Sequence, residues 1–135
     1  MSTAEYVVDS WAWVEYLRGG ASGQSVRVAV EGGARLLTTP ITLAEIVSKF
    51  AREGLDREEA SRAIGSLARI DPITQEDAKE AGSIHAQLKK ETRNFSLGDA
   101  FVLQLARKRN AKVLTGDPDF RGLPEAEMIS GARRV

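Results

Sequence analysis

The sequence contains no cysteine and a single histidine, His85. The lack of cysteine excludes disulfides, thiolate zinc sites and cysteine nucleophiles, and one histidine cannot build a histidine metal cluster. Lys plus Arg and Asp plus Glu both number 19, so the formal net charge is zero. A neutral chain argues against a protein that coats nucleic acid by bulk charge, although local basic patches could still bind it. Any chemistry must therefore come from carboxylates, hydroxyls and the backbone.

Long hydrophobic runs are also missing. No apolar stretch approaches the ~20 residues of a membrane span, and the first residues do not begin a signal peptide, so a cytoplasmic protein is expected. The chain has 135 residues, of which 42% are hydrophobic and 28% are charged. These values are typical of one soluble globular domain, here expected to cover residues 1–135.

Short apolar runs alternate with amphipathic segments along the chain. Strands are expected at residues 6–8, 36–37, 70–73, 112–115 and 126–129. Helices are expected at residues 10–17, 22–30, 40–53, 56–67, 74–92 and 100–108. Strands that alternate with helices predict an α/β fold, a three-layer α/β/α sandwich with a mainly parallel central sheet. The order of the strands cannot be read from the sequence.

Four acidic residues stand where such a fold gathers ligand groups. Asp9 and Asp117 follow expected strands, Glu45 lies in the first turns of a helix, and Asp99 begins another helix. The carboxyl ends of parallel strands and the helix N-termini that follow them lie at one edge of the sheet. The four acids, from four separate segments, are therefore expected to meet in a metal cleft.

Each acid also has a structural interpretation. Asp99 forms a Ser-x-x-Asp capping box with Ser96, Asp9 could cap the first helix, and Asp117 belongs to an Asp-Pro-Asp turn. Glu45 alone reads as a solvated helix residue. The metal hypothesis depends on the convergence of all four, because carboxylates held together repel one another unless a cation neutralises them.

An all-carboxylate site favours hard cations, Mg²⁺ or Mn²⁺. Clusters of this kind bind a phosphate diester, and a bound ion lowers the pKa of the attacking water. Ser10 and Thr115 carry hydroxyls next to Asp9 and Asp117. These hydroxyls could orient a water or phosphate, or could serve as capping and turn groups.

Four short motifs resemble those of the PIN-domain family, and especially its VapC-type toxin ribonucleases from prokaryotic toxin–antitoxin pairs. The motifs are Val8-Asp9-Ser10, Leu43-Ala44-Glu45, Leu97-Gly98-Asp99-Ala100 and Leu114-Thr115-Gly116-Asp117-Pro118-Asp119-Phe120. The resemblance covers essentially the whole chain. It implies a Mg²⁺- or Mn²⁺-dependent endoribonuclease, usually a homodimer, that is inhibited by a small cognate antitoxin.

The resemblance also implies roles for individual residues. Asp9, Glu45, Asp99 and Asp117 match the acidic quartet of the family, and Thr115 matches its hydroxyl residue near the metal. Asp119 matches a fifth metal-site position, which is acidic in only some relatives.

Two rival hypotheses remain open. One is a phosphoaspartate-type phosphatase or receiver domain, although Trp11 stands where such a phosphatase would have its second aspartate. The other is a non-catalytic PIN-like interaction module, which would tend to lose the acidic set.

Other residues indicate binding less clearly. Lys89, Lys90 and Arg93 could meet an RNA backbone at the rim of the cleft or could simply be a solvated helix end. Trp11 and Trp13 could stack on bases or on a partner's helix. Trp11 fits the apolar stripe of its helix and is expected in the core, whereas the pattern leaves Trp13 unassigned.

Overall fold

The computed structural model describes residues 4–129. Over this range it contains five strands: β1 (Glu5–Val8), β2 (Arg35–Thr38), β3 (Arg69–Ile70), β4 (Lys112–Thr115) and β5 (Ala126–Met128). The helices are α1 (Ser10–Arg18), α2 (Gly23–Glu31), α3 (Pro40–Arg52), α4 (Arg57–Leu67), α5 (Gln75–Leu88) and α6 (Leu97–Arg109), with a short 3₁₀ helix, η1 (Pro118–Phe120). None of the helices within residues 4–129 is both long and apolar enough to cross a membrane.

The five strands form one parallel sheet in the order β3-β2-β1-β4-β5. Val7 of β1 is aligned with Leu37 of β2 on one side and with Val113 of β4 on the other. The chain thus moves outward from β1 to β3 and then returns to the opposite side of β1. In an open α/β sheet, ligands bind at the carboxyl ends of the strands where the order reverses, which here is the junction of β1 and β4.

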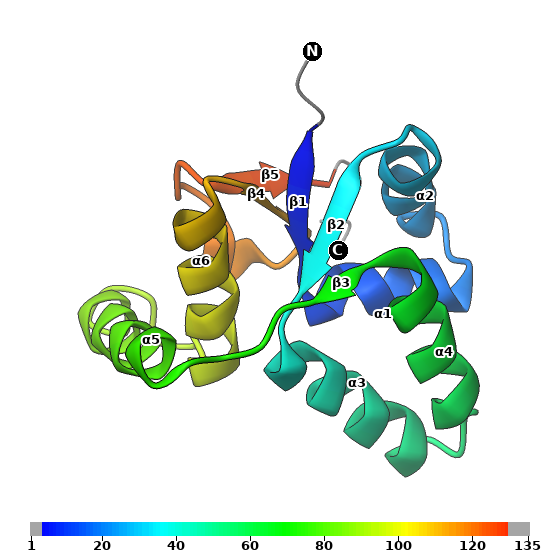
Figure 1. Cartoon of the computed structure of the whole chain (residues 1–135), viewed down its shortest axis with the longest axis horizontal. Coiled ribbons are helices and arrows are strands. Elements are labelled where there is room, and N and C mark those ends of the chain that lie inside the picture. Colours follow the sequence, from blue (N-terminus) through cyan, green and yellow to red (C-terminus); the bar gives the residue numbers. More distant parts are fainter. Residues whose placement is uncertain (1–3, 130–135) are drawn as a thin grey trace.

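Helices cover both faces of the sheet (Figure 1). Side chains alternate between the faces along each strand, so Val7 and Val113 contribute to the core beneath α5 and α6. Val8 and Leu114 contribute to the second core, beneath α1–α4. The predicted three-layer α/β/α sandwich with a parallel sheet is confirmed.

The start of α1 confirms the structural interpretation of Asp9. Asp9 is the N-cap residue, and its side chain accepts a hydrogen bond from the backbone N–H of Ala12. Trp13 is fully buried, while Trp11 is only half-buried. The prediction of Trp11 in the core is confirmed only in part, because Trp11 packs against the core from its border. The Trp13 indole N–H donates to Thr38 Oγ1 across the layer at 3.2 Å, so its one polar group has a partner inside the core.

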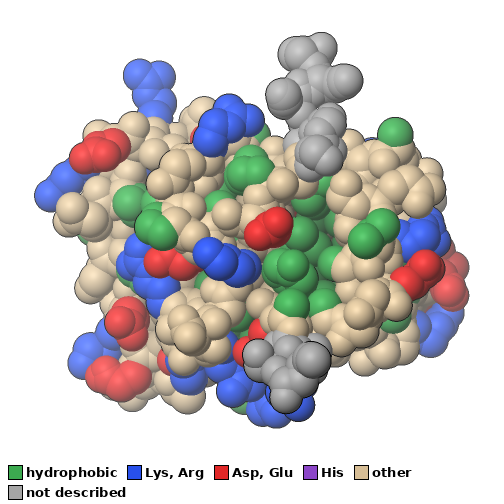
Figure 2. All heavy atoms as spheres, turned by 90° about the horizontal axis from the view of Figure 1, so that it is seen from above, with side chains coloured by type: hydrophobic (Ala, Val, Ile, Leu, Met, Phe, Trp, Pro, Cys, Tyr) green, Lys and Arg blue, Asp and Glu red, His purple; other side chains and the backbone are tan. Residues whose placement is uncertain are grey.

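The face at the amino ends of the strands carries charges of both signs. Figure 2 shows basic and acidic side chains interspersed there, with apolar side chains gathered near the middle. Among the exposed apolar residues, Val28 of α2 is 70% exposed. This mixture agrees with the zero net charge, and the acidic residues discussed below lie at the carboxyl edge instead.

Candidate metal centre

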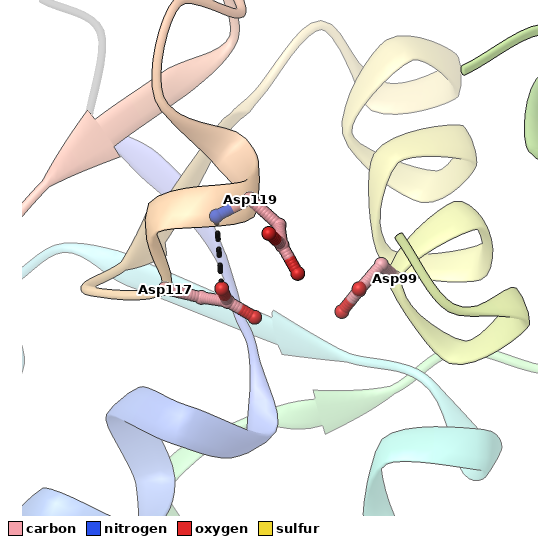
Figure 3. A group of neighbouring side chains, drawn as sticks. All are labelled: Asp99, Asp117 and Asp119. Carbon is pink, nitrogen blue, oxygen red and sulfur yellow. Dashed lines mark hydrogen bonds between the residues drawn. The ribbon is translucent and has the colours of Figure 1, made fainter. Parts of the chain in front are cut away.

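Three aspartates converge at the carboxyl edge of the sheet. Asp99 lies in the first turn of α6, whereas Asp117 and Asp119 belong to the loop and 3₁₀ helix that follow β4. One carboxylate oxygen from each lies within 4.8 Å of the other two. Figure 3 shows Asp117 and Asp119 facing Asp99 across a gap. The Asp119 backbone N–H donates to the Asp117 carboxylate at 2.9 Å, which fixes the loop side of this cluster.

The position of Asp99 is set by a capping box at the start of α6. Its carboxylate Oδ2 accepts from the Ser96 backbone N–H at 2.9 Å, and the Ser96 Oγ accepts from the Asp99 backbone N–H at 3.0 Å. The predicted capping box of Ser96 and Asp99 is thus confirmed. The capping bond engages Oδ2, so the same carboxylate can also offer an oxygen to a ligand in the cleft.

Asp9 lies at the end of β1 and is only 3% exposed. It accepts from the Ala12 backbone N–H at 2.8 Å and from the Thr115 hydroxyl at 2.5 Å. Burial above all, together with the charges of Asp117 and Asp99, raises the pKa of this carboxyl to about 7, against the opposing effect of the two hydrogen bonds. A buried acid with a raised pKa beside other acids is typical of a functional site.

Thr115 connects Asp9 to the loop after β4. Its Oγ1 accepts from the Asp117 backbone N–H at 2.9 Å and donates to Asp9. A single hydroxyl thereby fixes the Asp9 side chain relative to the turn that carries Asp117. The structure places the predicted hydroxyl residue between two of the predicted acids.

Glu45 extends from α3 toward the first turn of α6, which carries Asp99. Its carboxylate lies so close to Gly98 that a Cβ atom at position 98 would overlap it. Partial burial raises the pKa of Glu45, the Ser10 hydroxyl opposes this, and the charge of Asp99 adds to the rise. Although the residue as a whole is exposed, its carboxylate is therefore partly desolvated next to the first turn of α6.

Gly98 is the residue that sequence reasoning missed. The signal was present, since a glycine inside the first turn of a helix costs stability relative to alanine. Such a glycine often marks the close approach of another group. Here the approaching group is the carboxylate of Glu45.

The acids are electrostatically coupled even where they do not share the 4.8 Å cluster. Within residues 4–129 that cluster contains Asp99, Asp117 and Asp119. The charge of Asp99 acts on both Asp9 and Glu45, which lie outside the cluster. Burial is the largest cause of the raised pKa values of Asp99 and Asp119, and the charge of Asp117 contributes to both. Asp117 also acts on Asp9. The donor set consists of oxygen atoms and is destabilised by its own charge, which fits a hard divalent cation.

Basic side chains approach this centre from two sides. The charge of Lys89 lowers the pKa of Asp119, so Lys89 lies near this aspartate. Lys89 is also the C-cap residue of α5, so both sequence interpretations of it stay open. Lys49 and Arg52 of α3 line a pocket of about 480 Å³ that also includes Glu45 and Asp117.

Comparisons with known proteins agree with this geometry. The family model described as "PIN domain" matches residues 6–126. No curated protein matches the chain by sequence. Because the solved structures that resemble the chain and are described next are less than 25% identical to it, they support the fold and not the activity.

Three solved structures illustrate the similarity. A toxin–antitoxin complex from Klebsiella pneumoniae contains a chain that is 22% identical, with a TM-score of 0.68, and the match covers 91% of this chain and 96% of that one. Mycobacterium tuberculosis VapC20, a toxin that cleaves the sarcin–ricin loop, is 17% identical with a TM-score of 0.69 and coverages of 91% and 98%. VapBC2 from Rickettsia felis, bound to a DNA fragment from its promoter, is 15% identical with a TM-score of 0.68 and coverages of 92% and 96%.

Proposed function

Because the chain belongs to the PIN-domain family, we propose that it is a Mg²⁺- or Mn²⁺-dependent endoribonuclease, the toxin of a VapBC-type toxin–antitoxin pair. The observation that carries the proposal is the cluster of Asp99, Asp117 and Asp119 at the reversal point of the sheet. An acidic set of this kind is what a non-catalytic module would have least reason to keep, because its mutual repulsion destabilises the fold.

The carboxylates have distinct tasks in this proposal. Asp99, Asp117 and Asp119 provide oxygen ligands for the cation, from two sides of the cleft. Asp9 contributes a buried carboxylate at the base of the site, and Thr115 holds it in place by a hydrogen bond. Glu45 approaches Asp99 from α3 and completes the acidic set.

The reaction is hydrolysis of an RNA phosphodiester by water, with no covalent enzyme intermediate. A divalent ion in such a site lowers the pKa of a bound water and offsets the charge that develops on the leaving oxygen. His85 of α5 has no part in this scheme, since the chemistry needs only carboxylate ligands and the Thr115 hydroxyl. The acids in turn must be ionised, which a bound cation favours.

The partners follow from the same assignment. One of the structures described above is a toxin–antitoxin complex, and another is VapBC2 bound to a DNA fragment from its promoter. We expect this chain to bind a small cognate antitoxin, to form a homodimer and to act in the cytoplasm. An Arg or Lys of the antitoxin would complement the carboxylates of the cleft and displace the metal.

The decisive experiment is cleavage of a panel of structured RNAs in Mg²⁺, in Mn²⁺ and in EDTA. Wild-type protein should cleave at least one RNA only when metal is present, and Asp99→Asn should slow this cleavage by about a hundredfold or more. Asp56→Asn is the matched control, because Asp56 also caps a helix, α4, by accepting from a backbone N–H at 3.0 Å. It lies outside the acidic centre and its variant should cleave normally.

Two results would contradict the proposal. Cleavage that persists in EDTA would exclude the metal mechanism. Equal cleavage by wild type and Asp99→Asn would leave Asp99 with its capping role alone.

A further inference from the structure

A groove leads away from the acidic centre between α1 and α3. It encloses the pocket of about 480 Å³, and both helices begin at the carboxyl edge of the sheet and run away from it (Figure 1). Glu45 and Asp117 line the end of the pocket next to the acids. Arg18, Lys49 and Arg52 also line it and belong to the later turns of the two helices. Glu15 of α1 is a third acidic residue of the lining. The later turns of the two helices therefore supply three cations and one carboxylate to the pocket.

The spacing on α3 orders these charges along the groove. Lys49 is one turn beyond Glu45, about 6 Å along the helix axis, and Arg52 is about 10 Å beyond it. Cations near a helix C-terminus need no ligand to explain them. The second observation is that cations from two different helices line one pocket that opens onto the acidic centre. A phosphodiester strand held at the acids would carry its next negative charges in this direction.

Glu53 forms ion pairs with two of these three cations in the structure. Its carboxylate forms ion pairs with Lys49, at 2.9 Å, and with Arg18. Lys49 is the first cause of the lowered pKa of Glu53. The Lys49 and Arg18 side chains remain 38% and 44% exposed, and exposed ion pairs contribute little. A phosphate can therefore replace Glu53 as their partner.

Trp11 adds an aromatic surface to the same pocket. It lines the pocket and is half-buried, whereas Trp13 of the same helix is fully buried. Aromatic side chains bind unpaired bases by stacking, with little dependence on sequence. The pocket volume lies in the range of sites for small molecules, about 300–1,000 Å³, which suits nucleotides of one strand and not a duplex.

We propose that the α1–α3 groove binds single-stranded RNA on one side of the scissile phosphate, with Lys49 and Arg52 on the backbone and Trp11 against a base. Glu53 acts as an internal competitor that occupies Lys49 and Arg18 in the free protein. This inference rests on the proposed nuclease function, and it names the strand-binding side and the unpaired state of the substrate.

The first test measures binding without cleavage. A short, unstructured, fluorescein-labelled RNA of mixed sequence is titrated with Asp99→Asn protein in Mg²⁺, and further variants are made in this background. Lys49→Gln and Arg52→Gln should each weaken binding and reduce the slope of log affinity against log salt by about 0.7. Glu53→Gln should tighten binding about two- to fivefold, the change that corresponds to one exposed ion pair.

The chain offers a matched control pair on the other side of the sheet. Lys79 and Glu76 of α5 form an exposed ion pair at 3.2 Å that resembles the Lys49–Glu53 pair. Lys79→Gln and Glu76→Gln change the net charge identically but lie outside the groove. They should leave both affinity and salt slope nearly unchanged. Equal effects of Glu53→Gln and Glu76→Gln would mean that only net charge matters, and would overturn the groove.

The second test is spectroscopic. Trp11 and Trp13 are the two tryptophans of the chain, so stacking of a base on Trp11 should quench part of the intrinsic fluorescence when RNA binds. Trp11→Phe keeps an aromatic ring for the packing of α1 and leaves Trp13 as the remaining fluorophore. Quenching should disappear in this variant, provided that its melting temperature shows it folded. Quenching that persists in Trp11→Phe would exclude stacking on Trp11.

The remaining outcomes separate this inference from the nuclease assignment. The same RNA annealed to its complement should bind more weakly than the single strand, and equal binding would contradict an unpaired substrate. If Lys49→Gln leaves RNA binding intact but weakens inhibition by the partner protein, the groove serves the protein partner and the inference fails. Wild-type cleavage together with an inert groove rejects the groove alone, whereas groove binding without any cleavage rejects the nuclease.

Discussion

The carboxylate of Glu45 lies against the backbone of Gly98, in the space that a side chain at position 98 would fill. This contact joins α3 to the first turn of α6, one residue before Asp99. Glycine in a helix is less favourable than alanine by roughly 0.5–1 kcal/mol. The chain accepts this cost at a point where it brings a fourth carboxylate toward the metal centre.

Gly98→Ala should therefore separate stability from activity. The new methyl group displaces the end of the flexible Glu45 side chain, while alanine favours the helix, so the variant should melt no lower than wild type. RNA cleavage should fall to the level of Glu45→Gln. Because both changes act on one carboxylate, the double variant should be little worse than either single variant.

Gly82 of α5 provides the control for that experiment. It is also helical, but a Cβ atom there would meet nothing within 4 Å. Gly82→Ala should raise stability in the same way without reducing cleavage. If Gly98→Ala cleaves as fast as Gly82→Ala, the position of Glu45 has no influence on the reaction.

The acidic residues should behave as one unit. Asp9→Asn, Asp99→Asn and Asp117→Asn should each reduce cleavage by about a hundredfold or more, and pairs of these changes should add little, as for other residues that act jointly. Single-turnover rates at saturating RNA measure this directly. Additive losses in the double variants would show that the three carboxylates act independently, which a shared metal site does not allow.

Most elements could be predicted from the sequence, because apolar runs and capping residues are local signals. Local signals did not decide the fate of Trp11 and Trp13, which are two positions apart on one helix. Trp13 is fully buried and its indole N–H donates to Thr38 of β2, and that contact exists only once α1 and β2 are brought together by the fold. The strand order could not be predicted from the sequence either, because the pairing of strands also depends on contacts between distant segments.

The arrangement of the site was predicted only in part. The edge was correct, since Asp9 and Asp117 follow neighbouring parallel strands. The resemblance assigned Asp119 to a fifth metal-site position that is acidic in only some relatives. In the structure, however, Asp119 belongs to the cluster formed with Asp99 and Asp117. The 3₁₀ turn of Pro118–Phe120 causes this, because it directs Asp119 back toward Asp117. Turn geometry of that kind is not visible in residue spacing.

Metal binding should stabilise the folded protein. A ligand that binds only the folded state adds about 2.7 kcal/mol at a hundredfold excess over its Kd, which is several degrees in Tm at a few degrees per kcal/mol. Thermal melting in EDTA, Mg²⁺ and Mn²⁺ measures this shift. A Tm that is indifferent to both ions would mean that the aspartates serve only as caps and turns.

Asp117→Asn should reverse the order of stabilities between these conditions. The charge of Asp117 raises the pKa values of Asp9, Asp99 and Asp119, so its removal relieves repulsion with all three. Asparagine can still accept the hydrogen bond from the Asp119 backbone N–H, since asparagine is as good a cap as aspartate. The variant should melt above wild type in EDTA and lose this advantage in Mg²⁺. A variant that melts below wild type in EDTA would contradict this prediction. It would show that the ionised Asp117 carboxylate stabilises the metal-free protein.

The stability of the metal-free protein should depend on pH with a definite sign. The pKa of Asp9 is raised from 3.8 to about 7 by burial, so the folded state binds this proton more tightly than the unfolded state does. The resulting stabilisation is fully present below about pH 4 and is lost as the pH rises to about 7. Each pKa unit corresponds to 1.36 kcal/mol, so in EDTA the free energy of unfolding should fall by a few kcal/mol over this range.

Asp9→Asn is the variant that isolates this effect. At pH 4 the Asp9 carboxyl is protonated, and like the asparagine amide it then has one carbonyl oxygen and one donor group. The variant should therefore be about as stable as wild type at pH 4. Its stability should change much less between pH 4 and 7, because its side chain does not titrate. Urea unfolding at several pH values in EDTA gives both slopes, and equal slopes would show that Asp9 keeps an ordinary pKa. Added Mg²⁺ should flatten the wild-type profile as well, since a bound cation favours the ionised carboxylates that a higher pH produces.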